Sequence, residues 1–134
     1  MSIELASIIQ NTFGITRYQP LNIDLPISDE MKEYFQLMGN ETYGYHDFTF
    51  YNYNRVKEEF LNYTHFYIIG CYYTNGCNYY IAADKYNPIY FIFNMKDGND
   101  FSIDDLSGGK YYSSLAELFT DITNNDVKNN YIFY

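Results

Sequence analysis

Hydrophobic side chains in three stretches of the chain recur three or four residues apart, which is the spacing of an amphipathic helix. The stretches cover residues 3–13, residues 28–39 and the segment that begins at residue 114. Ser28 is a suitable N-cap for the second stretch, and Gly39 suits its C-terminal end. Ser114 and Glu117 have the spacing of a capping box. We therefore predict three helices.

Between the second and third helices the pattern changes to that of β-strands. Residues 66–94 contain runs of β-branched and aromatic residues, and Asn75-Gly76 between two of these runs predicts a hairpin turn. Weaker patterns predict a strand over residues 47–53 and a short helix or turn over residues 55–63. We expect a single α+β domain over residues 1–134, with a central antiparallel sheet of hairpin-linked strands and N- and C-terminal helices packed on it.

The predicted turn also determines how the two strands beside it pair. A two-residue loop pairs Thr74 with Cys77 and Cys71 with Tyr80. The two cysteines then point to opposite sides of the sheet and cannot share a metal ion or a disulfide. Their spacing also matches no common zinc or redox motif. We therefore predict no metal site at the cysteines.

The same pairing divides the hairpin into two faces of different chemistry. An apolar face, suited to a core under helices, consists of Phe66, Ile68, Gly70, Tyr72, Tyr79, Ile81 and Ala83. A mixed face consists of Tyr67, Ile69, Cys71, Tyr73, Asn78, Tyr80, Ala82 and Asp84. A row of tyrosines on a mixed face can anchor a partner. The alternative, which is the more common outcome, is that another helix or loop of the chain covers it.

Composition narrows the class of partner. The chain has 17 Asp and Glu against 8 Lys and Arg, a net charge of −9, and its cations form no cluster. Nucleic acid binding requires a basic patch, so we expect no nucleic acid partner. An acidic surface instead favours encounter with basic proteins. The 18 tyrosines exceed what a core needs and suit half-exposed faces and interfaces.

The sequence shows no constellation that predicts catalysis. Its two histidines stand near no nucleophile motif, and no glycine-rich phosphate loop is present. The acidic segment over residues 95–112 lacks the glycine and glutamate positions of a calcium-binding EF-hand loop. We therefore expect no enzymatic activity, no cofactor and no metal.

The beginning of the chain bears on its location. It has neither the basic nor the apolar region of a signal peptide, and no apolar run approaches the length of a membrane span. We expect a cytoplasmic protein with reduced thiols and no membrane partner.

Several short motifs occur in an order that resembles the SUKH superfamily. They are Leu25-Pro26, YFQLMGN at the end of the second helix, Ile69-Gly70, Asn75-Gly76, YIAAD ending at Asp84, and SSLAELF over residues 113–119. The resemblance covers about residues 23–123. This superfamily includes fungal cell-wall synthesis regulators and many bacterial immunity proteins. The resemblance implies a non-catalytic α+β domain that binds and neutralises a toxin, often a nuclease.

Our first hypothesis is thus an immunity protein that binds a basic, nuclease-type toxin through charge complementarity and tyrosine anchors. The candidate partner-binding residues are Tyr72, Tyr73, Tyr80, Asp84, Asp97, Asp100, Asp104 and Asp105. Two alternatives stay open. One is a general interaction module of a cell-wall or signalling pathway, and the other is a small-ligand binder with a concave polar pocket.

Overall fold

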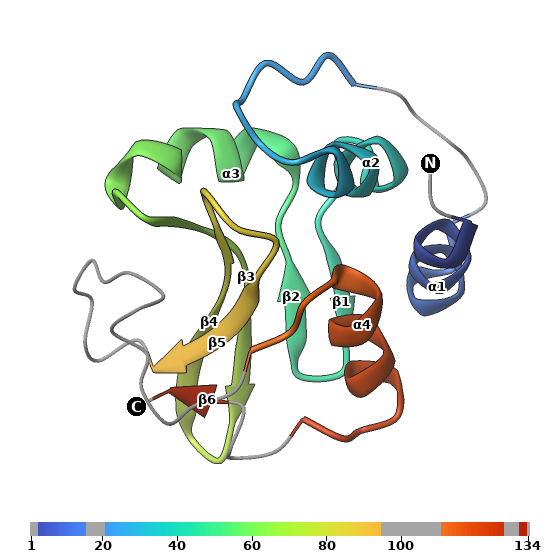
Figure 1. The fold of residues 1–134 in the computed structure, drawn as a ribbon. Helices are drawn as coiled ribbons and strands as arrows, with labels where there is room; N and C mark the ends of the chain where they lie inside the picture. Colours follow the sequence, from blue (N-terminus) through green and yellow to red (C-terminus); the bar gives the residue numbers. More distant parts are fainter. Residues whose placement is uncertain (1–2, 16–20, 95–110, 128–131, 134) are drawn as a thin grey trace.

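The computed structural model describes residues 3–15, 21–94, 111–127 and 132–133, and the side chains of residues 3, 132 and 133 are not described. Its elements, drawn in Figure 1, are α1 (Ile3–Phe13), α2 (Asp29–Met38), β1 (Tyr43–Tyr45), β2 (Phe48–Phe50), α3 (Tyr53–Glu59), the short 3₁₀ helix Phe60–Asn62, β3 (Phe66–Thr74), β4 (Cys77–Asp84), β5 (Tyr90–Asn94), α4 (Leu115–Thr123) and β6 (Ile132–Phe133). The strands form one sheet in chain order. Strands β1 to β5 are antiparallel, which confirms the α+β prediction, and β6 lies parallel to β5.

Three helices cover one face of the sheet. Figure 1 shows α1, α2 and α4 on the same side, with α3 beside β3. The ring of Phe119 in α4 lies 5.6 Å from that of Phe13 in α1 and 4.8 Å from that of Phe50 in β2. Tyr90 of β5 donates a hydrogen bond to Glu30 of α2. The apolar stripes predicted for the helices therefore meet in one core.

The predicted helix ends are confirmed. The Ser28 hydroxyl accepts a hydrogen bond from the Met31 amide at 3.2 Å, and Gly39 has a φ of 65°. The Ser114 hydroxyl accepts from the Glu117 amide at 3.1 Å. The Glu117 carboxylate accepts from the amide of Ser113, one residue earlier than in an ordinary capping box.

Two short elements lie where the sequence pattern was weak. Strand β2 is shorter than the predicted strand, because Asn52 ends it by capping α3: its side chain accepts from the Arg55 amide at 2.9 Å. Strand β1 was not predicted, and it pairs with β2 across a two-residue turn at His46 and Asp47.

The β3–β4 hairpin turns as predicted. Asn75 and Gly76 have φ values of 51° and 76°, as a two-residue hairpin turn of type I′ requires. Thr74 pairs with Cys77 and Cys71 with Tyr80, so the two free cysteines lie on opposite faces.

The faces predicted for the part of β3 before Gly70 are wrong, because β3 contains a bulge between Ile68 and Gly70. Ile68 pairs with Ala82 and Gly70 with Ile81, so one residue of β3 has no counterpart on β4. Phe66 and Ile68 consequently lie on the face away from the three helices, and Tyr67 lies on the face toward them.

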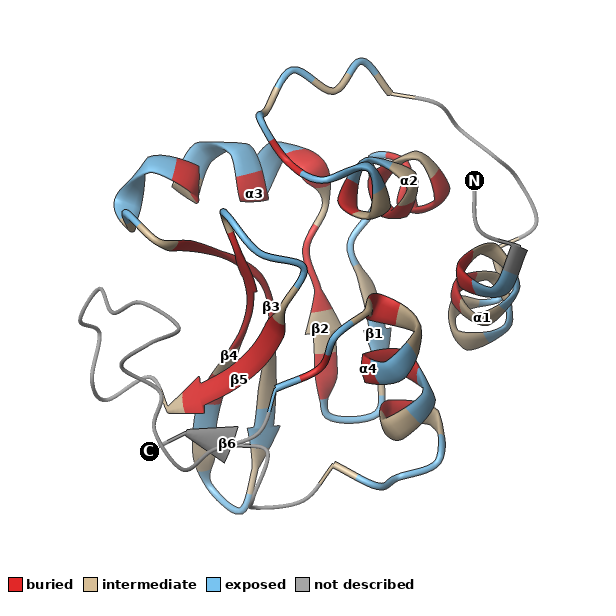
Figure 2. Ribbon diagram, in the orientation of Figure 1, coloured by how far each residue is buried: buried red, intermediate tan, exposed pale blue. Residues whose placement is uncertain are grey.

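Two further observations describe the surroundings of this part of β3. The Phe66 ring lies 5.6 Å from that of Phe91 and 5.3 Å from that of Phe93, in a buried cluster on the far face. Gly70 allows the close approach of β2, since a Cβ atom there would lie 2.4 Å from the carbonyl oxygen of Thr49. Figure 2 shows the buried residues of β3, β4 and β5 in red.

Candidate functional site

The structure does not bring the described candidate residues together. Tyr72 lies on the helix-covered face, whereas Tyr73 and Tyr80 lie on the opposite face. Tyr73 is 52% exposed near the hairpin tip, and Tyr80 is half-buried. Burial, followed by the nearby Tyr63, raises the pKa of Tyr80. Asp97, Asp100, Asp104 and Asp105 lie outside the described residues.

Asp84 has a structural role. It is 8% exposed, and one of its carboxylate oxygens accepts hydrogen bonds from the amides of Tyr86 and Asn87 at 3.0 and 2.8 Å. The same oxygen accepts from the Asn87 side chain at 3.1 Å. The carboxylate therefore stabilises the turn between β4 and β5, and little of its surface is exposed for contact with a partner.

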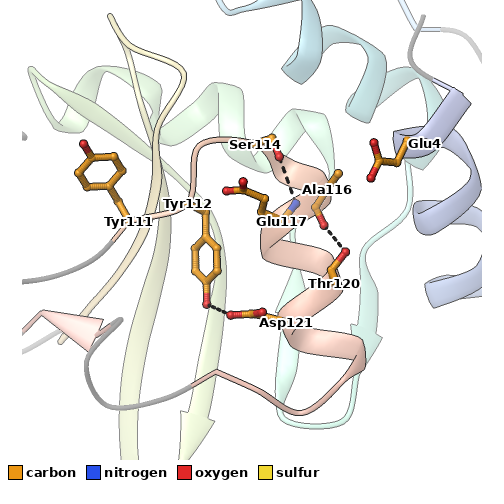
Figure 3. Close-up of a pocket in the computed structure, with 8 residues that line it drawn as sticks. All are labelled: Glu4, Tyr111, Tyr112, Ser114, Ala116, Glu117, Thr120 and Asp121. Carbon is orange, nitrogen blue, oxygen red and sulfur yellow. Dashed lines mark hydrogen bonds between the residues drawn. The ribbon is translucent and has the colours of Figure 1, made fainter.

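A different group of acidic residues meets beside α4. A surface pocket of about 450 Å³, here called the α4 groove, is lined by Glu4, Tyr111, Tyr112, Ser114, Ala116, Glu117, Thr120 and Asp121. Figure 3 shows these residues on α4, on the segment before it and on α1. Glu4 of α1 and Glu117 and Asp121 of α4 thus line one groove, although their segments are more than a hundred residues apart in the chain.

The amphipathic pattern of α4 explains why these side chains face outward. Its buried stripe is Leu115, Leu118, Phe119 and Ile122, and the groove residues occupy the other side of the helix. Two internal hydrogen bonds fix the wall. Tyr112 donates to Asp121 at 3.0 Å, and Thr120 donates to the Ala116 carbonyl at 2.7 Å. The groove therefore presents ordered acceptors.

The charge of the α4 groove is not balanced by its own lining. Glu4 and Glu117 are exposed, Asp121 is half-buried, and no lysine or arginine is present among the described residues that line the groove. Tyr111, which is 47% exposed, stands at one end. This combination suits the binding of a cationic surface with an aromatic contact beside it.

The described cations lie elsewhere. Arg55 sits 3.8 Å over the ring of Tyr51, and Lys57 pairs with Asp24 at 2.7 Å. Lys85 sits 4.2 Å over the ring of Phe60. All three are at the α3 end of the molecule, and Lys32 is on α2.

A second pocket lies at the other end of α4. It has a volume of about 300 Å³, is here called the turn pocket, and is lined by Tyr45, His46, Asp47, Phe48, Tyr72, Ile122, Thr123 and Asn125. The rings of Phe48 and Tyr72 stack at 4.1 Å with an angle of 3° between their planes. Tyr72, a predicted candidate, therefore contributes to a pocket, although not to one shared with Tyr73 or Tyr80.

The α4 groove and the turn pocket were not predicted, because each combines residues from separate segments. The one sequence signal was the exposed side of α4, where Glu117 and Asp121 are four residues apart and therefore on one face. Nothing in the sequence indicated that Glu4 would join them, since that depends on the packing of α1 against α4.

Within the described ranges, no three His, Cys, Asp or Glu side chains gather where they could hold a metal ion. None of the described helices is both long enough and apolar enough to cross a membrane.

No family model, curated protein or solved structure matches the chain. The resemblance to the SUKH superfamily and the function it implies stay predictions.

Proposed function

We propose that the protein is a non-enzymatic immunity protein that binds and neutralises a basic protein toxin, and that the α4 groove is its main contact surface. The observation that carries the binding part is that Glu4, Glu117 and Asp121 line one groove with exposed Tyr111, with no cation among the described lining residues. The choice of a toxin as partner comes from the family resemblance.

The electrostatics favour a basic protein as the partner. A net charge of −9 accelerates encounter with cationic proteins, and charges close to the contact then select the orientation. The hydrogen bond between Tyr112 and Asp121 orders one acceptor before binding, which reduces the entropy lost on association. Exposed tyrosines such as Tyr111 are frequent binding hot spots.

The alternative functions differ in what they require of this surface. A general interaction module would use the same groove without a toxic partner. A small-ligand binder finds some support in the volume of the groove, which falls within the range of ligand pockets. Such pockets, however, are lined mainly by apolar side chains, whereas carboxylates and hydroxyls dominate here.

Co-expression tests the proposed function directly. The protein would be produced together with the product of the gene immediately upstream, and cell survival and co-purification would be scored. The proposal expects toxicity of the upstream product alone, with rescue and a stable complex when both are present. A non-toxic product that still co-purifies would indicate the general interaction module instead.

A pair of charge reversals then locates the surface. Glu4→Lys lies in the α4 groove, and Glu58→Lys lies on the exposed side of α3, so both raise the net charge equally. We expect Glu4→Lys to weaken the complex about tenfold, or about 1.4 kcal/mol, and Glu58→Lys to change it much less. Equal losses would mean that only net charge matters. Thermal unfolding of both variants controls for stability, because Glu4 lies in the first turn of α1.

A further inference from the structure

The turn pocket has three properties that together specify one kind of ligand group. Its wall is aromatic, its charge is negative, and its backbone is held in place from both sides.

The aromatic part of the wall comes from adjacent strands. Phe48 and Tyr72 pair across β2 and β3 and their rings stack, and Tyr45, which pairs with Phe48 from β1, lines the same pocket. The rings of Tyr45 and His46 pack in a T-shaped arrangement, with their centroids 4.5 Å apart and an angle of 88° between their planes. Aromatic faces attract cations, and flat guanidinium groups stack on them with the best fit.

The negative charge of the pocket comes from one carboxylate and one helix end. Asp47 is exposed and lines the pocket. The C-terminal end of α4 reaches the pocket through Thr123 and Asn125, and this end of a helix dipole is negative. The last turn of α4 contains no basic residue, and no lysine or arginine lines the described pocket. Among the described residues, no cation accompanies this helix C-terminus, where a positive charge is favourable.

The backbone on both sides of the pocket is fixed in turns. His46 and Asn125 have φ values of 52° and 57°, a region that costs energy for residues other than glycine. The Asp47 carbonyl accepts from the Tyr73 amide at 3.0 Å, and the Ile122 carbonyl accepts from the Asn125 amide at 3.2 Å. A pocket with fixed walls loses little entropy when it binds a side chain.

We infer that the turn pocket receives a single arginine side chain of the basic partner, whose guanidinium group stacks on the ring of Tyr45 and pairs with Asp47. This inference rests on the proposed function, and it adds a specific anchor at the opposite end of α4 from the broad acidic groove. Arginine fits better than lysine, because its planar fork can stack and donate at the same time.

The first test needs no partner protein. N-acetyl-arginine amide would be titrated into the ¹⁵N-labelled protein, with N-acetyl-citrulline amide as the uncharged probe of the same shape and N-acetyl-lysine amide as the charged probe of another shape. We expect saturable amide shifts at Asp47, Tyr72 and Thr123 for arginine, weaker ones for lysine and none for citrulline. Equal responses to arginine and citrulline, or shifts spread evenly over the acidic surface, would overturn the inference.

Three variants sharpen this result. Asp47→Asn should weaken arginine binding about two- to fivefold, as expected for an ion pair at an exposed site, and Tyr45→Leu should weaken it while the carboxylate remains. Glu58→Gln removes one negative charge from α3 and should leave binding unchanged. Binding that is insensitive to both pocket variants would place the arginine elsewhere.

The same variants separate this inference from the proposed function. If a toxin is captured and its complex weakens with Glu4→Lys but not with Asp47→Asn, the arginine pocket is wrong and the proposed function stands. If the arginine probe binds as expected but no toxic partner exists, the pocket stands as an arginine site and the immunity function is wrong.

Discussion

Two tyrosine–aspartate pairs at opposite ends of the molecule show how differently the chain treats its acids. At the α3 end, Tyr53 donates to Asp24 at 2.7 Å, and at the α4 end, Tyr112 donates to Asp121 at 3.0 Å. Asp24 also binds Lys57 at 2.7 Å, and Lys57, followed by Tyr53, lowers the pKa of its carboxyl group. Asp121 instead lines a groove together with Glu117 and Glu4, and the described lining of that groove contains no cation.

This difference indicates where charge is available for a partner. At the α3 end the cations are engaged within the chain, by Asp24 and by the rings of Tyr51 and Phe60. At the α4 end the described lining of the groove contains three carboxylates and no cation, so these acids remain available to a cationic partner. A surface of uncompensated like charge is destabilising for the free protein, so it is the better candidate for binding.

The largest expected effect compares how much a buried side chain of α4 and one of α3 contribute to the free energy of unfolding. Phe119→Ala should lower the free energy of unfolding by about 4 kcal/mol, because its fully buried ring packs on rings of α1, α2 and β2. Val56→Ala in α3 removes a smaller buried side chain and should cost about 2 kcal/mol. Urea unfolding of both variants measures the difference, and a similar loss at the two sites would contradict it.

The next largest effect is a difference between the two tyrosine hydroxyls in how much stability is lost when each is removed. Tyr53→Phe should cost about 2 kcal/mol, because the hydroxyl also accepts from the amides of Asp24 and Leu25 and both would be left unpaired. Tyr112→Phe removes the hydrogen bond that the hydroxyl donates to Asp121 and should cost about 1 kcal/mol. Chemical denaturation under identical conditions compares them. A larger loss at Tyr112 would mean that Asp121 depends on that bond more than Asp24 does on its own.

Removing the hydroxyl of a third tyrosine should increase the stability of the fold. Tyr34 is fully buried between α2 and α4, and its hydroxyl has no hydrogen-bond partner within the described part of the chain. Tyr34→Phe should therefore raise the free energy of unfolding by about 1 kcal/mol, since it removes an unpaired buried polar group. Tyr90→Phe is the matched control, because that hydroxyl donates to Glu30 and its loss should destabilise. A destabilised Tyr34→Phe would reveal a partner for the hydroxyl.

The smallest effect is the pH dependence of the Asp24 pair. The pKa of Asp24 in the folded protein lies below its ordinary value of 3.8, so the pair stabilises the fold above that value. This stabilisation is lost as the pH falls through the lowered pKa. Lys57→Met should flatten this part of the stability profile only slightly, because both side chains are about half exposed. Urea midpoints across the acidic range would detect it, and an unchanged profile would assign the shift to Tyr53.

Local interactions made much of the fold predictable. The caps at Ser28 and Ser114 and the turn at Asn75-Gly76 depend on neighbours within four residues, and all three were found where the sequence placed them. The same locality accounts for the correct register next to the turn.

The candidate site was much less predictable, and Tyr72 shows why. Its stacking on Phe48 depends on the pairing of β2 with β3, and the pocket around it depends on where α4 ends. Neither the pairing of β2 with β3 nor the end of α4 can be inferred from the residues close to Tyr72 in the chain. By contrast, the position of Tyr73 and Tyr80 on the other face was predicted correctly, because it follows from the pairing next to the turn.

The sequence by itself determined the helices, the hairpin turn and the acidic character of this protein, because each follows from residue type and short-range spacing. Only the tertiary structure decided on which faces of the sheet Phe66, Tyr67 and Ile68 lie, because a bulge between Ile68 and Gly70 shifts the pairing of β3 with β4 by one residue. It also decided that Glu4 meets Glu117 and Asp121, because that meeting requires α1 to pack against α4 from the far end of the chain.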